Sequence, residues 1–288
     1  MRTLTGLIAR RIVPGMRIGY CTGFSEDEVA WASRAGFTTL EIGYINAGED
    51  AWKRARDTFE RHNLRPMSVF HYADYGDPDP SRASEAVRQA RRAMQQCLVV
   101  GAPVYACNAF AGHAGTPKEK LANFKRIFSP LAQEAGDLGL KIAIENCPHH
   151  LHNVAWSPVM WEAMFNEVPH PAIGLEYDPS HLVWMSVDYV AALAKFADRV
   201  YAFHAKDTEV FRDRLTWGGI YGERWWRYRI PGWGEIDWKK LLTILWERGY
   251  PGDIAIEHED PVFRDNRRRE GLTRGLEHLR GLIEAPAA

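Results

Sequence analysis

Four short apolar segments of the sequence carry an acidic or imidazole side chain near their ends. These residues are Glu145 in segment 141–147, Asp178 in 172–178, His204 in 200–206 and Glu257 in 253–259. Three carboxylates beside an imidazole in an apolar setting are unfavourable unless a cation compensates them. The pattern therefore predicts one divalent metal ion bound by these four residues, with rim salt bridges as the alternative. Ligands that are mostly oxygen with one nitrogen favour Mn²⁺, or Mg²⁺ or Co²⁺, over a structural zinc ion.

Other polar residues near the same segment ends are candidates for substrate binding. They are His71, Asn108, His150, His152, His181 and Lys206. A histidine can move a proton near neutral pH, and a lysine can stabilise a developing negative charge. The alternatives are a hydrogen-bonded core histidine at position 71, solvated loop histidines at 150 and 152, and a simple charge partner at position 206.

Eight apolar segments alternate with amphipathic segments along the chain. The apolar segments are 16–21, 38–44, 66–72, 103–110, 141–147, 172–178, 200–206 and 253–259, with the composition of strands buried on both faces. Amphipathic helices are predicted at 25–36, 116–139, 157–168, 236–250 and 266–284, with Ser25, Thr116 and Ser157 as candidate first caps. This α/β pattern predicts a single (β/α)₈ TIM barrel over residues 1–288. A doubly wound open sheet is the alternative, but no G-x-G-x-x-G follows the first strand.

An aromatic-rich insertion at 210–234 lies between the seventh predicted strand and its helix. It is long for a strand-to-helix loop, which is typical of a functional segment. Its Trp225 and Trp226 could wall a sugar or aglycone pocket, or bury themselves in an interface between subunits. The insertion is therefore expected either to wall the pocket or to form the interface of a homo-oligomer.

The overall composition excludes several classes of partner. A formal net charge of −1 gives no electrostatic reason to expect nucleic acid or an anionic membrane as partner. The first sixteen residues lack an apolar core typical of a signal peptide, and no apolar run reaches spanning length. The four cysteines are scattered without C-x-x-C spacing, which favours reduced thiols and a cytoplasmic location.

The motifs at the strand ends also occur in a characteristic order. The series "AIEN", "DPSH", "FHAKD", "PGWGEIDW" and "AIEHED" resembles the xylose isomerase-like barrel superfamily, in particular its sugar phosphate isomerase/epimerase branch. The resemblance implies that Glu145, Asp178, His204 and Glu257 bind one divalent metal and that His181 contacts the substrate. The segment "WWRYRIP" before Gly232 lacks the Asp-x-His pair of the endonuclease branch, which argues against a trinuclear phosphodiesterase. This chain also has Lys206 where related epimerases often carry an arginine.

The expected reaction is proton transfer next to a carbonyl. A divalent metal can stabilise an enediolate, and Glu145 and Glu257 are the predicted catalytic acid and base. The first expectation is therefore a metal-dependent isomerase or epimerase that acts on a small sugar. The alternative is a lyase that eliminates a leaving group from a keto-glycoside. Both glutamates could instead be inert ligands, and a non-catalytic sugar-binding barrel is a further alternative from a different class.

Overall fold

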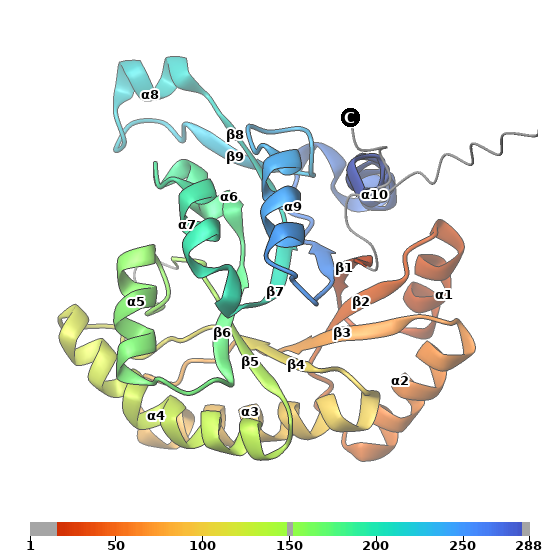
Figure 1. The fold of residues 1–288 in the computed structure, drawn as a ribbon, viewed down its shortest axis with the longest axis vertical. Coiled ribbons are helices and arrows are strands. Elements are labelled where there is room, and N and C mark those ends of the chain that lie inside the picture. The colour runs from red at the N-terminus through yellow and green to blue at the C-terminus, as the bar shows by residue number, and fades with distance from the viewer. Residues whose placement is uncertain (1–15, 149–151, 284–288) are drawn as a thin grey trace, which may run out of the picture.

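The computed structural model describes residues 16–148 and 152–283. Eight parallel strands close into a barrel in the order β1-β10-β7-β6-β5-β4-β3-β2, surrounded by helices (Figure 1). The closed order confirms the predicted (β/α)₈ barrel and excludes the open sheet. The barrel strands are β1 (Ile18–Thr22), β2 (Thr39–Gly43), β3 (Arg65–Phe70), β4 (Val104–Cys107), β5 (Lys141–Glu145), β6 (Ile173–Tyr177), β7 (Val200–Ala205) and β10 (Ile254–Ile256).

The strands lie at the predicted segments, but some end earlier. β4 ends three residues before its predicted end, where Asn108 donates to and accepts from the backbone of Ala73. Next to it, the Asn153 side chain accepts the N–H of Ala109. Side-chain amides therefore replace the sheet ladder at this end of the barrel, because buried backbone groups must still be paired.

Helices cover the outside of the barrel. They are α1 (Glu26–Ala35), α2 (Glu49–Arg61), α3 (Pro80–Val100), α4 (Pro117–Asp137), α5 (Pro158–Glu167), α6 (Pro179–Trp184), α7 (Tyr189–Phe196), α9 (Trp238–Glu247) and α10 (Arg268–Ile283). Ser25 and Thr116 cap their helices as predicted, and Thr116 forms a capping box with Glu119. Ser157 precedes α5 at the predicted position but makes no side-chain cap bond. No helix in the described part of the chain is both long and apolar enough to cross a membrane.

The interior of the barrel contains small side chains below polar ones. Ala143 and Ala202 belong to a buried cluster that is separate from the main core. Residues two apart on a strand point to the same face, so Glu145 and His204 point the same way as these alanines. The small alanines fill the barrel beneath them, and the ligand side chains therefore stand at the carboxyl end.

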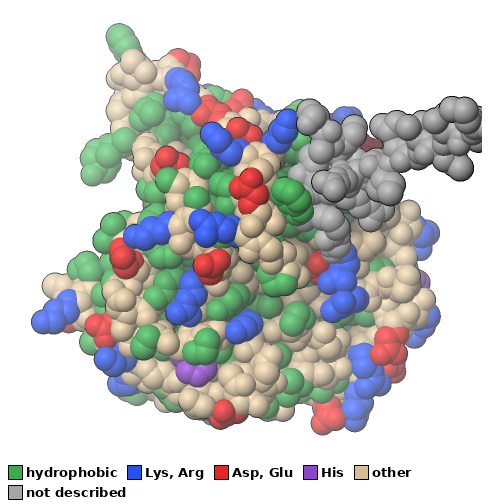
Figure 2. All heavy atoms as spheres, viewed as in Figure 1, with side chains coloured by type: hydrophobic (Ala, Val, Ile, Leu, Met, Phe, Trp, Pro, Cys, Tyr) green, Lys and Arg blue, Asp and Glu red, His purple; other side chains and the backbone are tan. Residues whose placement is uncertain are grey.

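The segment predicted as a long loop is an ordered arm. It consists of β8 (Asp207–Val210), α8 (Arg212–Gly218) and β9 (Trp226–Arg229), with β8 antiparallel to β9. The arm projects beyond the ring of helices (Figure 1) and carries hydrophobic side chains at its free end (Figure 2). Asp207 fixes its base, because the carboxylate accepts bonds from the N–H groups of Gly232 and Ile236 and from Trp238 Nε1.

Candidate metal centre

The four predicted metal ligands meet at one point. One ligand atom each from Glu145, Asp178, His204 and Glu257 lies within 4.8 Å of all the others. Glu145 is the last residue of β5, Asp178 caps α6 directly after β6, and Glu257 follows β10. His204 stands within β7, with Nδ1 3.4 Å from Glu145 and 3.2 Å from Glu257. Parallel strands therefore bring candidate ligands more than a hundred residues apart into a single cluster.

Two atoms of this cluster are well suited to a metal ion. Asp178 Oδ2 and His204 Nδ1 are buried and make no hydrogen bond within the described residues, although the Lys206 ammonium lies 3.1 Å from Asp178 Oδ2. Asp178 Oδ1 accepts the N–H of Ser180 at 2.8 Å, so the orientation of this carboxylate is fixed. Buried polar atoms are normally satisfied. These atoms, together with three carboxylates and one imidazole, fit a divalent cation.

A pair of buried glutamates lies behind His204. Its Nε2 is 3.1 Å from Glu41 and 3.2 Å from Glu176, while Ser68 donates to Glu41 at 2.5 Å. An Nε2–H that donates to Glu41 leaves the Nδ1 lone pair free for a metal, which is how an outer carboxylate usually orients a ligating histidine.

The two glutamates have opposite electrostatic environments. Burial raises the pKa of Glu176 well above its usual value, and the charge of Glu41 raises it further. Burial also raises the pKa of Glu41, but the charge of His204 and the hydrogen bonds around Glu41 lower it overall. The pKa values of the two glutamates are therefore shifted in opposite directions, and Glu41 is the one that bonds to His204 at 3.1 Å.

Neither glutamate was predicted from the sequence as a site residue. Each is the single charged residue within an otherwise uncharged strand, "TLEIG" for β2 and "IGLEY" for β6. A carboxylate in a strand that is buried on both faces is rarely tolerated without a partner. This was the signal that could have identified Glu41 and Glu176.

Lys206 lies beside the metal ligands on the side of the barrel mouth. Its Nζ is 2.6 Å from Glu257, 3.1 Å from Asp178 and 3.0 Å from Glu259. Burial alone lowers the pKa of Lys206, but these three negative charges raise it well above its usual value. The ammonium is therefore retained although the side chain is buried, and it links two metal ligands to the rim.

His181 also contacts the ligand cluster. Its Nε2 is 3.3 Å from Asp178 and 3.6 Å from Glu145, and its Nδ1 is 2.7 Å from the hydroxyl of Tyr228. Burial raises the pKa of Tyr228 to about 12, so this phenol stays protonated at neutral pH. Tyr228 belongs to β9, and the arm therefore supplies a residue to the centre.

The other predicted substrate residues have varied surroundings. His71 lies 3.1 Å from Gln89 through Nε2, with its ring against Tyr44. Asn108 is fully buried and uses its amide on the backbone of Ala73. His152 packs edge-on against His113. His150 lies outside the described residues.

The two predicted tryptophans differ in position. A groove on the arm is lined by Tyr228, Glu259 and Arg264 among others, and the buried Trp225 does not line it. Trp226 does line this groove. The Trp184 ring stacks on the Trp226 ring at a centroid distance of 4.8 Å, and the Arg224 guanidinium lies 4.2 Å from the Trp226 ring centre. Trp226 and Arg224 therefore line this part of the groove together, and the indole face is not open to a ligand by itself.

The sequence model of the xylose isomerase-like TIM barrel family matches residues 29–282. The chain belongs to this family. Among curated relatives, an inosose dehydratase of Clostridium botulinum is 29% identical over 256 residues, which cover 82% of this chain and 83% of that protein. The chain spans less than half the length of the other curated relatives considered.

Solved structures share the fold of this family member. The 3-keto-D-glucoside 4-epimerase YcjR from E. coli has a TM-score of 0.73 and 16% identity, covering 92% of this chain and 99% of that chain. The IolI protein with a bound zinc atom has a TM-score of 0.75 and 16% identity, covering 95% and 100%. At such identities the structural similarity supports the fold alone.

Proposed function

We propose that this protein is a divalent-metal-dependent sugar isomerase or epimerase that transfers a proton next to a carbonyl through an enediolate. The observation that carries the proposal is the cluster of Glu145, Asp178, His204 and Glu257 within 4.8 Å. A divalent ion bound there would supply positive charge that stabilises the negative oxygens of an enediolate. Three carboxylates with one imidazole favour Mn²⁺, with Mg²⁺ or Co²⁺ as alternatives.

The two glutamates are proposed as the proton-transfer groups. The Glu257 side chain is 21% exposed, whereas that of Glu145 is 4% exposed. Glu257 can therefore reach a substrate from the mouth of the barrel and is our candidate for the base. Glu145, which lies 3.4 Å from His204 Nδ1, is our candidate for the acid that returns a proton in an epimerisation.

Neighbouring cations and donors support these roles. Lys206 bonds to Glu257 at 2.6 Å and orients this carboxylate. His181 with Tyr228 is proposed to donate a hydrogen bond to a substrate oxygen. His71, His150, His152, Asn108, Trp225 and Trp226 stay predicted substrate contacts that mutagenesis can test.

The second candidate function is elimination from a keto-sugar or keto-glycoside. The first step is the same, because a base removes a proton next to a carbonyl, but a leaving group then departs. The similarity to an inosose dehydratase over 82% of this chain favours this alternative. A single exposed base, Glu257, suffices for elimination, whereas epimerisation also needs an acid on the opposite face of the substrate.

One experiment separates the two reactions. The Mn²⁺-supplemented protein is incubated with a panel of ketoses and keto-glycosides in D₂O and followed by NMR. Deuterium uptake with conservation of the sugar identifies an isomerase or epimerase, and release of water or an aglycone identifies a lyase. If no substrate exchanges a proton in the metal-loaded protein, the proposal is wrong.

We further propose a cytoplasmic homo-oligomer. Four free cysteines are consistent with a reducing compartment. Trp217 and Tyr221 at the tip of the arm are each 96% exposed, which favours their burial against a second copy. Sedimentation of the wild type and of Trp217→Ala tests this assembly, and two monomeric proteins would contradict it.

A further inference from the structure

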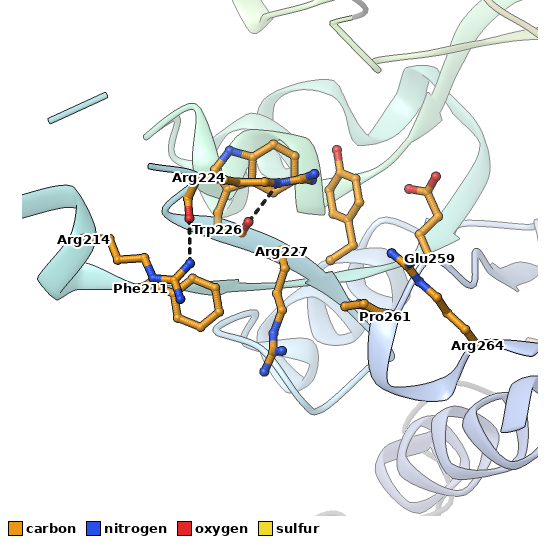
Figure 3. Close-up of a pocket in the computed structure, with 9 residues that line it drawn as sticks. Phe211, Arg214, Arg224, Trp226, Arg227, Glu259, Pro261 and Arg264 are labelled. Carbon is orange, nitrogen blue, oxygen red and sulfur yellow. Dashed lines mark hydrogen bonds between the residues drawn. The ribbon is translucent and has the colours of Figure 1, made fainter. Parts of the chain in front are cut away.

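A groove with four arginines opens between the arm and the loop after β10. Arg214, Arg224, Arg227 and Arg264 line it, and its volume is about 280 Å³ (Figure 3). The arginines come from two different parts of the chain, the arm and the segment that follows Pro261. Figure 3 shows Arg264 extending toward Glu259 on the side opposite Arg214.

The groove borders the surroundings of the candidate metal centre. Its lining includes Tyr228 and Glu259. The Tyr228 hydroxyl lies 2.7 Å from His181, and Glu259 lies 3.0 Å from Lys206. Two residues that line the groove therefore contact residues that adjoin the candidate metal ligands.

The charges of the groove do not cancel. Arg214 pairs with Glu223 at 3.0 Å and Arg227 pairs with Glu209 at 2.6 Å. Arg224 and Arg264 have no carboxylate partner within 4.0 Å in the described part of the chain. The Glu259 carboxylate is already bound to Lys206. Two guanidinium charges are left to attract an anion.

Contacts with the backbone and with aromatic rings hold two of the arginines in place. Arg224 lies over Trp226 and donates from Nε to the carbonyl of residue 226 at 3.1 Å. Arg214 lies over the Phe211 ring and donates to the Arg224 carbonyl at 3.2 Å. A guanidinium has five N–H donors, so each retains donors for a ligand. Side chains fixed in advance lose less entropy on binding.

We propose that this groove binds an oxyanion carried by the substrate, either a phosphate monoester or a carboxylate, while the keto-sugar part lies at the metal centre. This inference rests on the proposed function and adds the class of substrate. Planar guanidinium groups match both oxyanions. Convergence of the arginines on one small groove that shares residues with the metal centre favours a small anionic sugar over a nucleic acid or membrane surface, which would contact arginines spread across a face.

Calorimetric binding of three sugars to the Mn²⁺-loaded protein tests the proposal. The probes are glucose 6-phosphate, glucuronate and neutral glucose, at low salt. At least one anionic sugar is expected to bind about tenfold more tightly than glucose, as charge-assisted hydrogen bonds imply. The comparison of glucose 6-phosphate with glucuronate identifies which oxyanion is preferred.

A bound metal ion could itself attract an anion. Variants of the groove arginines therefore test whether the groove, and not the metal, binds the anionic sugar. Arg224→Ala and Arg264→Ala are each expected to weaken binding of the preferred anionic sugar by about tenfold and to leave glucose binding unchanged. Arg264 is exposed and without an ion pair among the described residues, so its removal does not threaten folding. Arg212→Ala is the matched control. Arg212 lies on the same arm and pairs with Glu235, but it does not line the groove.

The two possible failures can be distinguished. Equal binding of all three sugars, or anion binding that is unchanged in both groove variants, overturns the inference even if keto-sugars exchange protons with D₂O. Arginine-dependent anion binding without proton exchange in any substrate supports the groove and contradicts the proposed reaction.

Discussion

Lys206 is expected to hold the metal centre together when no metal is bound. Its ammonium contacts Asp178, Glu257 and Glu259 at 2.6–3.1 Å, and the residue is 1% exposed. Lys206→Met keeps a long unbranched side chain but removes the charge. Removal of one partner from a buried ion pair costs about 3–5 kcal/mol. The contact with half-exposed Glu259 adds less than about 1 kcal/mol, so the loss comes mainly from the two metal ligands.

The free energy of unfolding is measured by urea denaturation with a chelator and again with saturating Mn²⁺. Without metal, Lys206→Met is expected to lose about 3–5 kcal/mol. Metal at a hundred times its dissociation constant stabilises a protein by about 2.7 kcal/mol. The variant is expected to gain more from Mn²⁺ at a fixed concentration than the wild type, because the cation then replaces the missing charge.

A matched surface variant controls for the loss of a lysine. Lys195 pairs with Glu162, and both side chains are 58% exposed. Lys195→Met is expected to cost less than about 1 kcal/mol and to leave the stabilisation by Mn²⁺ unchanged. The reasoning is refuted if Lys206→Met costs no more than this control, or if metal stabilises both variants equally.

Three further predictions address the base, the buried glutamate pair and acid stability. Glu257→Gln is expected to reduce deuterium exchange at least about 100-fold while bound metal, measured by elemental analysis, falls less. Glu41→Gln is expected to weaken metal binding about 10- to 100-fold in chelator competition, because His204 loses its charged acceptor; equal affinity would contradict this role. Burial raises the pKa of Glu28, but hydrogen bonds from Arg268 and Tyr20 lower it overall. The ionised Glu28 carboxylate therefore stabilises the folded protein above pH about 4.3, and this stabilisation is lost as the pH falls through the folded pKa. The stability difference between wild type and Glu28→Gln should therefore shrink in acid, and a constant difference from pH 7 to pH 3 would contradict it.

Much of the fold was predictable because its signals are local. A strand that is buried on both faces is apolar throughout, and a helix start is marked by a cap within one turn, as at Ser25 and Thr116. Eight such units in series leave few topologies other than a closed barrel. The cluster of four candidate metal ligands was predictable for a related reason, since polar residues at the ends of apolar strands meet at the carboxyl end of that barrel.

Some predicted details differed because local signals do not fix them. The segment 210–234 was expected to be a loop, yet the arm begins at Asp207 and contains a hairpin, because four residues on each strand pair across it. Its pairing joins residues about twenty apart, which short-range periodicity does not register. The two tryptophans of this segment were equivalent in sequence, but only Trp226 lines the groove.

The sequence by itself determined the eight barrel strands, several of the helices and the four candidate metal ligands. Only the tertiary structure decided what surrounds them. Glu41 meets His204 across the barrel although 163 residues separate them, and Arg264 meets the arginines of the arm across a groove. Periodicity and capping act over a few neighbouring residues, whereas these contacts depend on strand register and on the face to which each side chain points. Those quantities are set only when the barrel closes.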